Sequence, residues 1–383
     1  MALLTSTPSA RFEESTATGS PALAPSATFD HLELYVGNAR AFTQLLCSGL
    51  GMTCVGYLGP ETGVRDRASY LLRQGAITLV VTAGLDPDSE IARHVLEHGD
   101  GVRTVAFAVE DVDYSYGQAV RRGAEPLFDP ADQRDGAGAV RSATIAAYGT
   151  TLHSFVDRSG YAATFGPGFE ADGLPSPSIG RPVGLEAIDH VVGNVEEGTL
   201  DKWAGWYAEV LGLTELRHFD ADQISTEYSA LRSMVMWNGG EVKLPLNEPA
   251  PGRRTSQIQE YLDTWGGPGV QHVAISTRDI VASVSELRSR GIRLLVPPPT
   301  YYEDARERCG DLDVPWADLE RLGILVDVDG GGYLLQVFTE TMSDRPTLFL
   351  EVIQREGATG FGEGNFKALF EAIEREQARR GNL

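Results

Sequence analysis

The segment WGGPGVQHVAISTRDI at residues 265–280 is a diverged copy of HGDGVRTVAFAVEDV at residues 98–112. A second match joins IDHVVGN at residues 188–194 to FDHLELYVGN at residues 29–38. In each copy the longer segment is followed by a helix-like run that ends in SRGI or RRGA. A repeat of this length indicates a duplicated module. We predict an α+β fold in which each half of the chain contains two βαβββ units.

Two histidines and a glutamate lie in segments that otherwise have the character of buried strands. His190 follows Asp189 near the start of one strand, His272 lies in GVQHVAIS, and Glu351 lies in the apolar run LFLEVIQ. An unpaired carboxylate is costly to bury in such a run, and coordination of a metal removes that cost. Two imidazoles and one carboxylate form the facial triad of non-haem iron enzymes. The three residues therefore predict the iron site of an oxygenase.

The first half of the chain keeps only one of the three ligands. His31 takes the place of the first histidine, but Thr104 takes the place of the second. An alignment of Arg158 with Arg355 puts Ser154 where the glutamate lies. The metal is therefore predicted in the second half alone. The other histidines have no such context and are interpreted as surface or structural residues: His94, His98, His153 and His218.

The composition is that of a soluble enzyme. The chain has 383 residues, of which 42% are hydrophobic, enough for two domains with substantial cores. Its formal net charge of -22 argues against nucleic acid and anionic membranes as partners, since phosphates require clustered cations. No apolar run reaches membrane-spanning length. Cys47, Cys54 and Cys309 form no CxxC pair, which predicts free thiols and a cytoplasmic location.

Composition also predicts the domain boundaries. Residues 1–27 are rich in Ser, Thr, Ala and Pro and are interpreted as a flexible tail. Residues 159–184 concentrate Gly, Pro and Ser and are interpreted as a linker. An N-terminal domain without metal is predicted at residues 28–158, and a catalytic domain at residues 185–383.

The last residues have the pattern of an amphipathic helix. Asn365 stands at the N-cap position, and Gly381 follows the last turn. The helix either packs on the second domain or forms a lid over its site. Its apolar residues recur at i, i+3, i+4 and i+7: Phe366, Leu369, Phe370 and Ile373.

Further differences between the copies indicate a pocket. Aligning ITLVVT at residues 77–82 with VKLPLN at residues 242–247 puts Pro245 and Asn247 where the first half has plain strand residues. Proline removes a donor from the ladder and belongs at an edge or opening. Each amide of this region has an ordinary role as a loop or strand hydrogen bonder, but together the amides could orient a polar aromatic substrate. They are Asn247, Gln257, Gln271 and Gln336.

Eight segments resemble the 4-hydroxyphenylpyruvate dioxygenase family: IDHVVGNV, TEYSAL, KLPLNEPA, SQIQEYL, GVQHVAIST, YLLQVFT, DRPTLFLEVIQR and GFGEGNFKALFEAIEREQ. The resemblance spans nearly the whole chain after the tail. It implies the vicinal-oxygen-chelate fold, with two open sheet barrels and one Fe(II) in the second. It also implies conversion of 4-hydroxyphenylpyruvate and O₂ to homogentisate and CO₂. Separately, we expect a homo-oligomer. Leu350 departs from the phenylalanine of many bacterial members, and we expect little effect.

The resemblance also implies roles for individual residues. The metal ligands fall on His190, His272 and Glu351. Residues that act on polar groups of the substrate fall on Ser229, Asn247, Gln257, Gln271 and Gln336. Residues that bind its remaining surface fall on Pro245, Phe338, Phe349, Asn365 and Phe366.

Three alternatives share this fold. A 4-hydroxymandelate synthase uses the same metal and substrate but hydroxylates the benzylic carbon, and Phe338 favours the dioxygenase because it should hold the ring for ipso attack. An extradiol ring-cleaving enzyme fits the C-terminal segment and the amides poorly. A metal-free protein that binds aromatic compounds has no need of the triad, although fold alone does not decide function.

Overall fold

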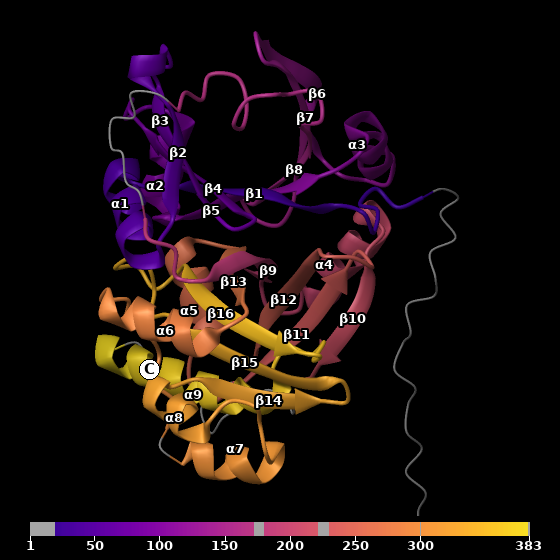
Figure 1. The fold of residues 1–383 in the computed structure, drawn as a ribbon. Helices are drawn as coiled ribbons and strands as arrows, with labels where there is room; N and C mark the ends of the chain where they lie inside the picture. Colours follow the sequence, from indigo (N-terminus) through magenta and orange to yellow (C-terminus); the bar gives the residue numbers. More distant parts are fainter. Residues whose placement is uncertain (1–19, 172–179, 221–229, 299, 382–383) are drawn as a thin grey trace, which may run out of the picture.

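The computed structural model describes residues 20–171, 180–220, 230–298 and 300–381. Within these residues the chain forms two curled eight-stranded sheets, one from each half (Figure 1). The strand order is β2-β3-β4-β1-β5-β8-β7-β6 in the first sheet and β10-β11-β12-β9-β13-β16-β15-β14 in the second, which is the same order. Each half contains two βαβββ units, so the predicted α+β fold of duplicated modules is confirmed.

The first sheet is built from residues 28–157. Its strands are β1 Thr28–Tyr35, β2 Thr53–Leu58, β3 Arg67–Gln74, β4 Ile77–Gly84, β5 Gly101–Ala108, β6 Pro126–Asp135, β7 Gly138–Ala146 and β8 Leu152–Asp157. Its helices are α1 Ala39–Leu50, α2 Glu90–His98 and α3 Val112–Arg121.

The second sheet is built from residues 185–356 and is followed by the C-terminal helix. Its strands are β9 Leu185–Asn194, β10 Thr214–Phe219, β11 Ala230–Trp237, β12 Lys243–Ala250, β13 Gly269–Thr277, β14 Leu325–Asp329, β15 Gly332–Phe338 and β16 Phe349–Glu356. The helices of this half are α4 Leu200–Trp206, α5 Gln257–Trp265, α6 Ile280–Ser289, α7 Tyr301–Cys309, α8 Trp316–Leu322 and α9 Phe366–Arg380.

The strand registers of the two sheets are equivalent at the positions of the triad. In both sheets an alanine of the central strand lies opposite a histidine on one side and opposite the third position of the triad on the other. These residues are His31, Ala106 and Ser154 in the first sheet and His190, Ala274 and Glu351 in the second. The pairing of Ser154 with Glu351 in the alignment of the two halves therefore holds in three dimensions.

The two halves share an apolar core, and hydrogen bonds also join them. Arg345, after β15, donates to the carbonyl oxygens of Glu97 and Leu96 near the end of α2. Leu350 faces this interface rather than the triad, since it lines a small apolar cavity between the halves. A small effect of this departure on the triad stays a prediction, and the position of Leu350 away from the pocket supports it.

His153 in β8 is buried at the same interface, where its Nε2 lies 2.7 Å from the hydroxyl oxygen of Tyr207. Burial lowers the pKa of His153 to about 4. An unfolded histidine titrates near 6.5, so between pH 6.5 and 4 the unfolded state binds the extra proton and stability falls as pH falls. Relative to His153→Gln, the metal-free protein should therefore lose up to about 3 kcal/mol of unfolding free energy across this window. Urea unfolding at several pH values measures this difference, and a pH-independent difference contradicts it.

The predicted C-terminal helix is confirmed as α9, which ends at Gly381 with a positive φ of 76°. Asn365 stands at the N-cap position of α9, as predicted, but its side chain does not cap the helix. Asn365 has helical backbone angles, makes no capping hydrogen bond, and instead accepts a hydrogen bond of 2.6 Å from the hydroxyl of Tyr301. None of the described helices is long and apolar enough to cross a membrane.

Candidate metal centre and substrate pocket

Three neighbouring strands bring the predicted ligands together. His190 lies on β9, His272 on β13 and Glu351 on β16, and these strands are adjacent in the second sheet. The Nε2 atoms of His190 and His272 lie 3.3 Å and 3.5 Å from the same carboxylate oxygen of Glu351. One potential ligand atom from each residue lies within 4.8 Å of the other two. Among the described residues this is the one cluster of three or more such groups that could hold a metal ion.

The electrostatics of the cluster suit a divalent cation. Burial by itself raises the pKa of Glu351, but the two histidines outweigh it and lower the pKa to about 2. Burial lowers the pKa of His272, whereas Glu351 and Asp189 raise that of His190 despite its burial. Two imidazoles and a carboxylate, with no further candidate ligand in the cluster formed by the described residues, fit a metal that keeps open coordination positions.

A β-bulge precedes each histidine ligand. The registers of β9 and β13 shift so that Asp189 and Gln271 have no residue opposite them. A regular strand sends consecutive side chains to opposite faces, whereas a bulge re-aims them. As a result, Asp189 lies 2.8 Å from Nδ1 of His190, and the Gln271 oxygen lies 3.0 Å from Nδ1 of His272. With Nδ1 as donor, both Nε2 atoms are free to coordinate a metal.

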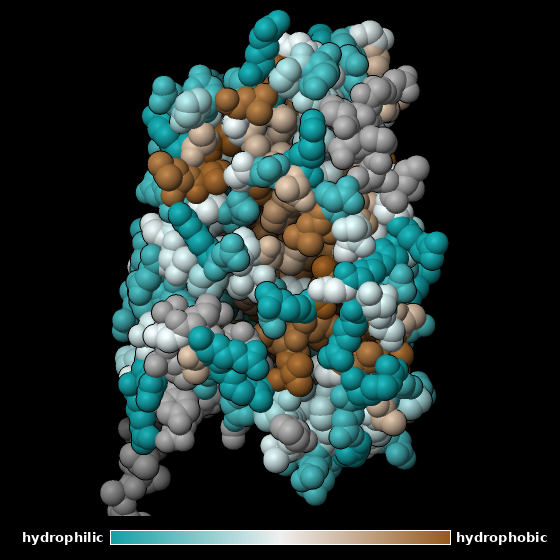
Figure 2. Space-filling view, turned by 90° about the vertical axis from the view of Figure 1, so that its left-hand side faces the viewer, coloured by the Kyte–Doolittle hydropathy of each residue, from teal (hydrophilic) through white to brown (hydrophobic). Residues whose placement is uncertain are grey.

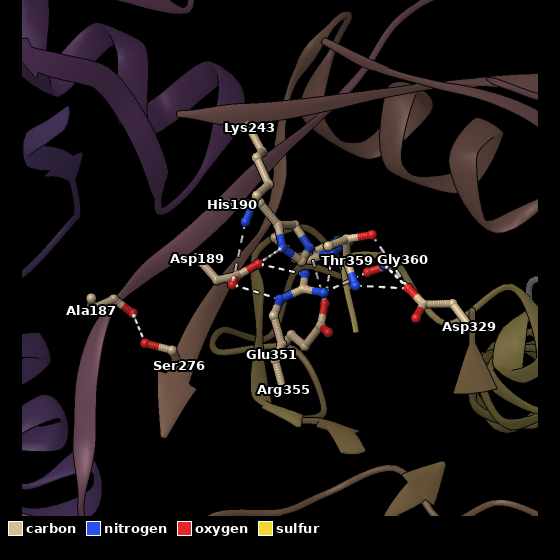
Figure 3. A network of polar contacts seen from close by, with 11 residues as sticks. Ala187, Asp189, His190, Lys243, Ser276, Asp329, Glu351, Arg355, Thr359 and Gly360 are labelled. Atoms are coloured by element: carbon tan, nitrogen blue, oxygen red, sulfur yellow. Dashed lines mark hydrogen bonds and ion pairs between the residues drawn. The ribbon is translucent and has the colours of Figure 1, made fainter. Parts of the chain in front are cut away.

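Asp189 is the centre of a polar network that sequence reasoning missed (Figure 3). Arg355 donates two parallel hydrogen bonds to it, of 2.8 and 2.9 Å, and Lys243 lies 3.7 Å away. Burial by itself raises the pKa of Asp189, but the hydrogen bonds from Arg355 and His190 hold it well below its ordinary value. The aspartate is therefore a carboxylate when it accepts from the imidazole.

A pocket opens beside the three ligands, and most of the predicted substrate residues line it. Asn365 does not line it, because its side chain points to Tyr301, and Ser229 lies outside the described residues. The predicted residues that the fold brings together there are Pro245, Asn247, Gln257, Gln271, Gln336, Phe338, Phe349 and Phe366. Lining residues that sequence reasoning missed include Phe219, Leu231, Ser233, Phe361 and Leu369.

Aromatic rings surround the ligands within this pocket. Phe349 stacks on His272 with 4.7 Å between ring centroids, and Phe338 meets the same imidazole edge-on at 6.1 Å. Phe361 lies edge-on to His190 at 5.2 Å. The repeat could have identified Phe361, because Phe165 has the same edge-on contact with His31 in the first half.

One polar side chain of the pocket can accept a hydrogen bond from a ligand. The Oε1 atom of Gln336 is buried and has no hydrogen-bond partner among the described residues. A buried acceptor left unpaired costs about 1–3 kcal/mol. Gln336 therefore suits a ligand that brings a hydroxyl or another donor.

The first half keeps His31 but has hydroxyl side chains at the other two positions of the triad. Ser154 Oγ hydrogen-bonds Thr144 Oγ1 at 2.8 Å, where the second half has Glu351 opposite Phe338. Thr104 likewise replaces an imidazole by a hydroxyl. Neutral hydroxyls are poor substitutes for the imidazole and carboxylate ligands of a divalent metal.

Comparisons with known proteins agree with this geometry. Residues 27–166 match the family model described as hydroxyphenylpyruvate dioxygenase, N-terminal, and residues 187–314 match the glyoxalase/bleomycin resistance protein/dioxygenase superfamily. The 4-hydroxyphenylpyruvate dioxygenase of Dictyostelium discoideum is 45% identical over 93% of this chain and 99% of its own. That of Danio rerio is 44% identical over 93% of this chain and 92% of its own.

Among solved structures, a mutant of 4-hydroxymandelate synthase from Streptomyces coelicolor superimposes with a TM-score of 0.82. It is 35% identical and covers 92% of this chain and 99% of its own. The full-length curated relatives, the duplicated sheets and the triad agree. The chain belongs to the 4-hydroxyphenylpyruvate dioxygenase family.

Proposed function

We propose that this protein is an Fe(II)-dependent 4-hydroxyphenylpyruvate dioxygenase. It converts 4-hydroxyphenylpyruvate and O₂ to homogentisate and CO₂ by oxidative decarboxylation, ring hydroxylation and side-chain migration. The observation that carries the proposal is the buried triad of His190, His272 and Glu351, which opens into a pocket lined by amides and phenylalanines. Relatives of the same curated activity cover nearly the whole chain.

The triad would hold one Fe(II) per chain through two Nε2 atoms and one carboxylate oxygen. When bound, the metal supplies a chelation site for the 2-oxo acid group and a position at which O₂ is activated. The protein contributes orientation and a dry environment. Phe338 and Phe349 offer apolar faces to the aromatic ring, and Gln336 accepts a hydrogen bond from a polar group of the substrate.

The remaining substrate contacts are proposed from the family. Asn247, Gln257 and Gln271 line the pocket and can bind the keto acid or the phenol, and Pro245 shapes its wall. Gln271 also orients the imidazole of His272, because its side-chain oxygen lies 3.0 Å from Nδ1 of that residue. Ser229 keeps its proposed role as a substrate residue, while Asn365 acts through its hydrogen bond with Tyr301.

4-Hydroxymandelate synthase is the nearest alternative, because one such enzyme is a structural neighbour. Both reactions start from the same substrate, so the position of the ring decides between them. Phe338 lies directly opposite Glu351 in the β15–β16 ladder and lines the pocket. This placement favours a ring held next to the metal, where the ring carbon is attacked.

The helix α9 is proposed to close the pocket as a lid. Phe366 and Leu369 line the pocket from α9, and Phe366 packs edge-on against Phe219 at 5.3 Å. We expect a truncation after Gly362 to lose most of its turnover, because water then enters the pocket, and to keep its Fe(II) affinity, because all three ligands precede it. Steady-state kinetics and metal titration measure the two effects. Turnover equal to that of the full chain contradicts the lid.

Anaerobic reconstitution with Fe(II), followed by aerobic incubation with 4-hydroxyphenylpyruvate, tests the proposed function. Products are separated by chromatography and identified by mass spectrometry, with His272→Ala as the inactive control. Homogentisate that disappears in the control supports the proposal. 4-Hydroxymandelate as the main product assigns the chain to the alternative, and bound iron without turnover directs the search to other 2-oxo acids. Fe(II) that fails to bind in a one-to-one ratio favours the metal-free binding protein.

A homo-oligomer in the cytoplasm, without nucleic acid or membrane partners, stays a prediction of the sequence. Figure 2 shows one face of the molecule, on which hydrophobic residues gather between hydrophilic ones. Exposed apolar patches of this kind are common at contacts between subunits.

A further inference from the structure

The second half contains an ordered chain of contacts behind the first histidine ligand. Asp329 accepts hydrogen bonds of 2.7 Å from the backbone N–H groups of Thr359 and Gly360. The carbonyl oxygen of Gly360 accepts from Arg355 at 2.6 Å, and Arg355 in turn donates twice to Asp189. Asp189 therefore has little freedom to move (Figure 3).

The first half contains the same arrangement without a metal cluster. Arg158 binds Asp30 through Nε and Nη2, Asp30 lies 2.6 Å from Nδ1 of His31, and Asp30 occupies a bulge of β1. Arg158 also donates to the carbonyl oxygen of Phe165 and lies over its ring, as Arg355 lies over Phe361. We call this arginine–aspartate–histidine arrangement the clamp. The chain carries two copies of it, and the second copy lies beside the candidate metal centre.

We propose that Asp189, clamped by Arg355, is the positioning residue of the metal centre. Its carboxylate fixes the His190 ring with Nδ1–H as donor and Nε2 directed at the metal position. A partner of this type orients a ligand imidazole and raises its basicity, and its loss typically lowers metal affinity about 10- to 100-fold. The inference rests on the proposed Fe(II) role of the triad and deepens it.

The alternative is that the clamp only stabilises the sheet. The copy in the first half makes that interpretation testable. Asp30 and Asp189 each bind an arginine and a neighbouring imidazole, and each lies in a bulge of its strand. A purely structural clamp affects folding in both halves alike. A positioning clamp affects the metal only in the second half.

The experiment compares Asp189→Asn with Asp30→Asn in the full chain. Fe(II) affinity is measured anaerobically by competition with a chromogenic chelator, and Co(II) is titrated to record its absorption spectrum. Asp189→Asn should lower the affinity for both metals about 10- to 100-fold and change the Co(II) spectrum. Asp30→Asn should leave affinity and spectrum unchanged. Thermal unfolding of both metal-free variants separates loss of stability from loss of metal.

A second pair guards against a variant that fails to fold. Arg355→Lys keeps the positive charge but loses the bidentate geometry, and Arg158→Lys is its match in the first half. We expect only Arg355→Lys to lower the affinity for the metal. Parental affinity and spectrum in both Asp189→Asn and Arg355→Lys would overturn the inference, as would a parent chain that binds neither metal. Normal metal binding without homogentisate formation contradicts the proposed function but leaves the role of Asp189 standing.

Discussion

Replacing Glu351 by alanine is expected to abolish the formation of homogentisate and to remove tight Fe(II) binding. Glu351 is the only carboxylate of the triad, and its Oε2 faces both imidazole Nε2 atoms. A metal that acts as Lewis acid supplies several kcal/mol of transition-state stabilisation. Since each ~1.4 kcal/mol is a factor of ten, turnover should fall at least about a thousandfold. Product assays and anaerobic Fe(II) titration measure the two losses.

The matched control is Ser154→Ala. Ser154 occupies the equivalent register position in the first sheet, opposite Ala106 as Glu351 is opposite Ala274. This variant loses the hydrogen bond to Thr144 but should keep parental metal content and turnover. Glu351→Ala that retains stoichiometric iron and activity would refute the triad, and a large loss in Ser154→Ala would place chemistry in the first half.

Replacing Phe338 by isoleucine is expected to shift the product from homogentisate toward 4-hydroxymandelate. Phe338 lies opposite Glu351 in the sheet, edge-on to His272 and 6.2 Å from the Phe349 ring. A smaller side chain frees space beside the metal, so that the substrate ring can move away and the benzylic carbon can approach. A difference of one or a few carbons in a hydrophobic pocket changes the relative free energies of competing transition states by about 1–3 kcal/mol. The ratio of the two products should therefore change about tenfold or more, as measured by quantitative chromatography.

The control for this change is Phe155→Ile. Phe155 is a fully buried phenylalanine of β8 in the first half and does not line the pocket. Both variants lose aromatic packing, but only the change at Phe338 alters the space around the substrate. An unchanged product ratio in Phe338→Ile removes the structural reason to prefer ring hydroxylation over benzylic hydroxylation.

The duplication and the cluster of two histidines and one glutamate were predictable from the sequence because they depend on strand order and residue type. His190, His272 and Glu351 contrast with His31, Thr104 and Ser154 at the same positions of a repeated pattern. A buried imidazole or carboxylate in an apolar strand needs a partner, and that requirement is visible in the sequence itself. The two-sheet fold followed from the same repeat, since equivalent segments form equivalent strands.

The tertiary structure decided what surrounds those ligands. Bulges are not apparent from a regular alternation of residues, so the contacts of Asp189 and Gln271 with the ligand imidazoles could not be foreseen. Asn365 stands at the N-cap of α9, but its side chain accepts a hydrogen bond from Tyr301 and does not cap the helix. Local patterns determine which residues are present in a strand. Small register shifts and contacts between distant segments determine where their side chains point, and these arise only when the sheets close around a common core.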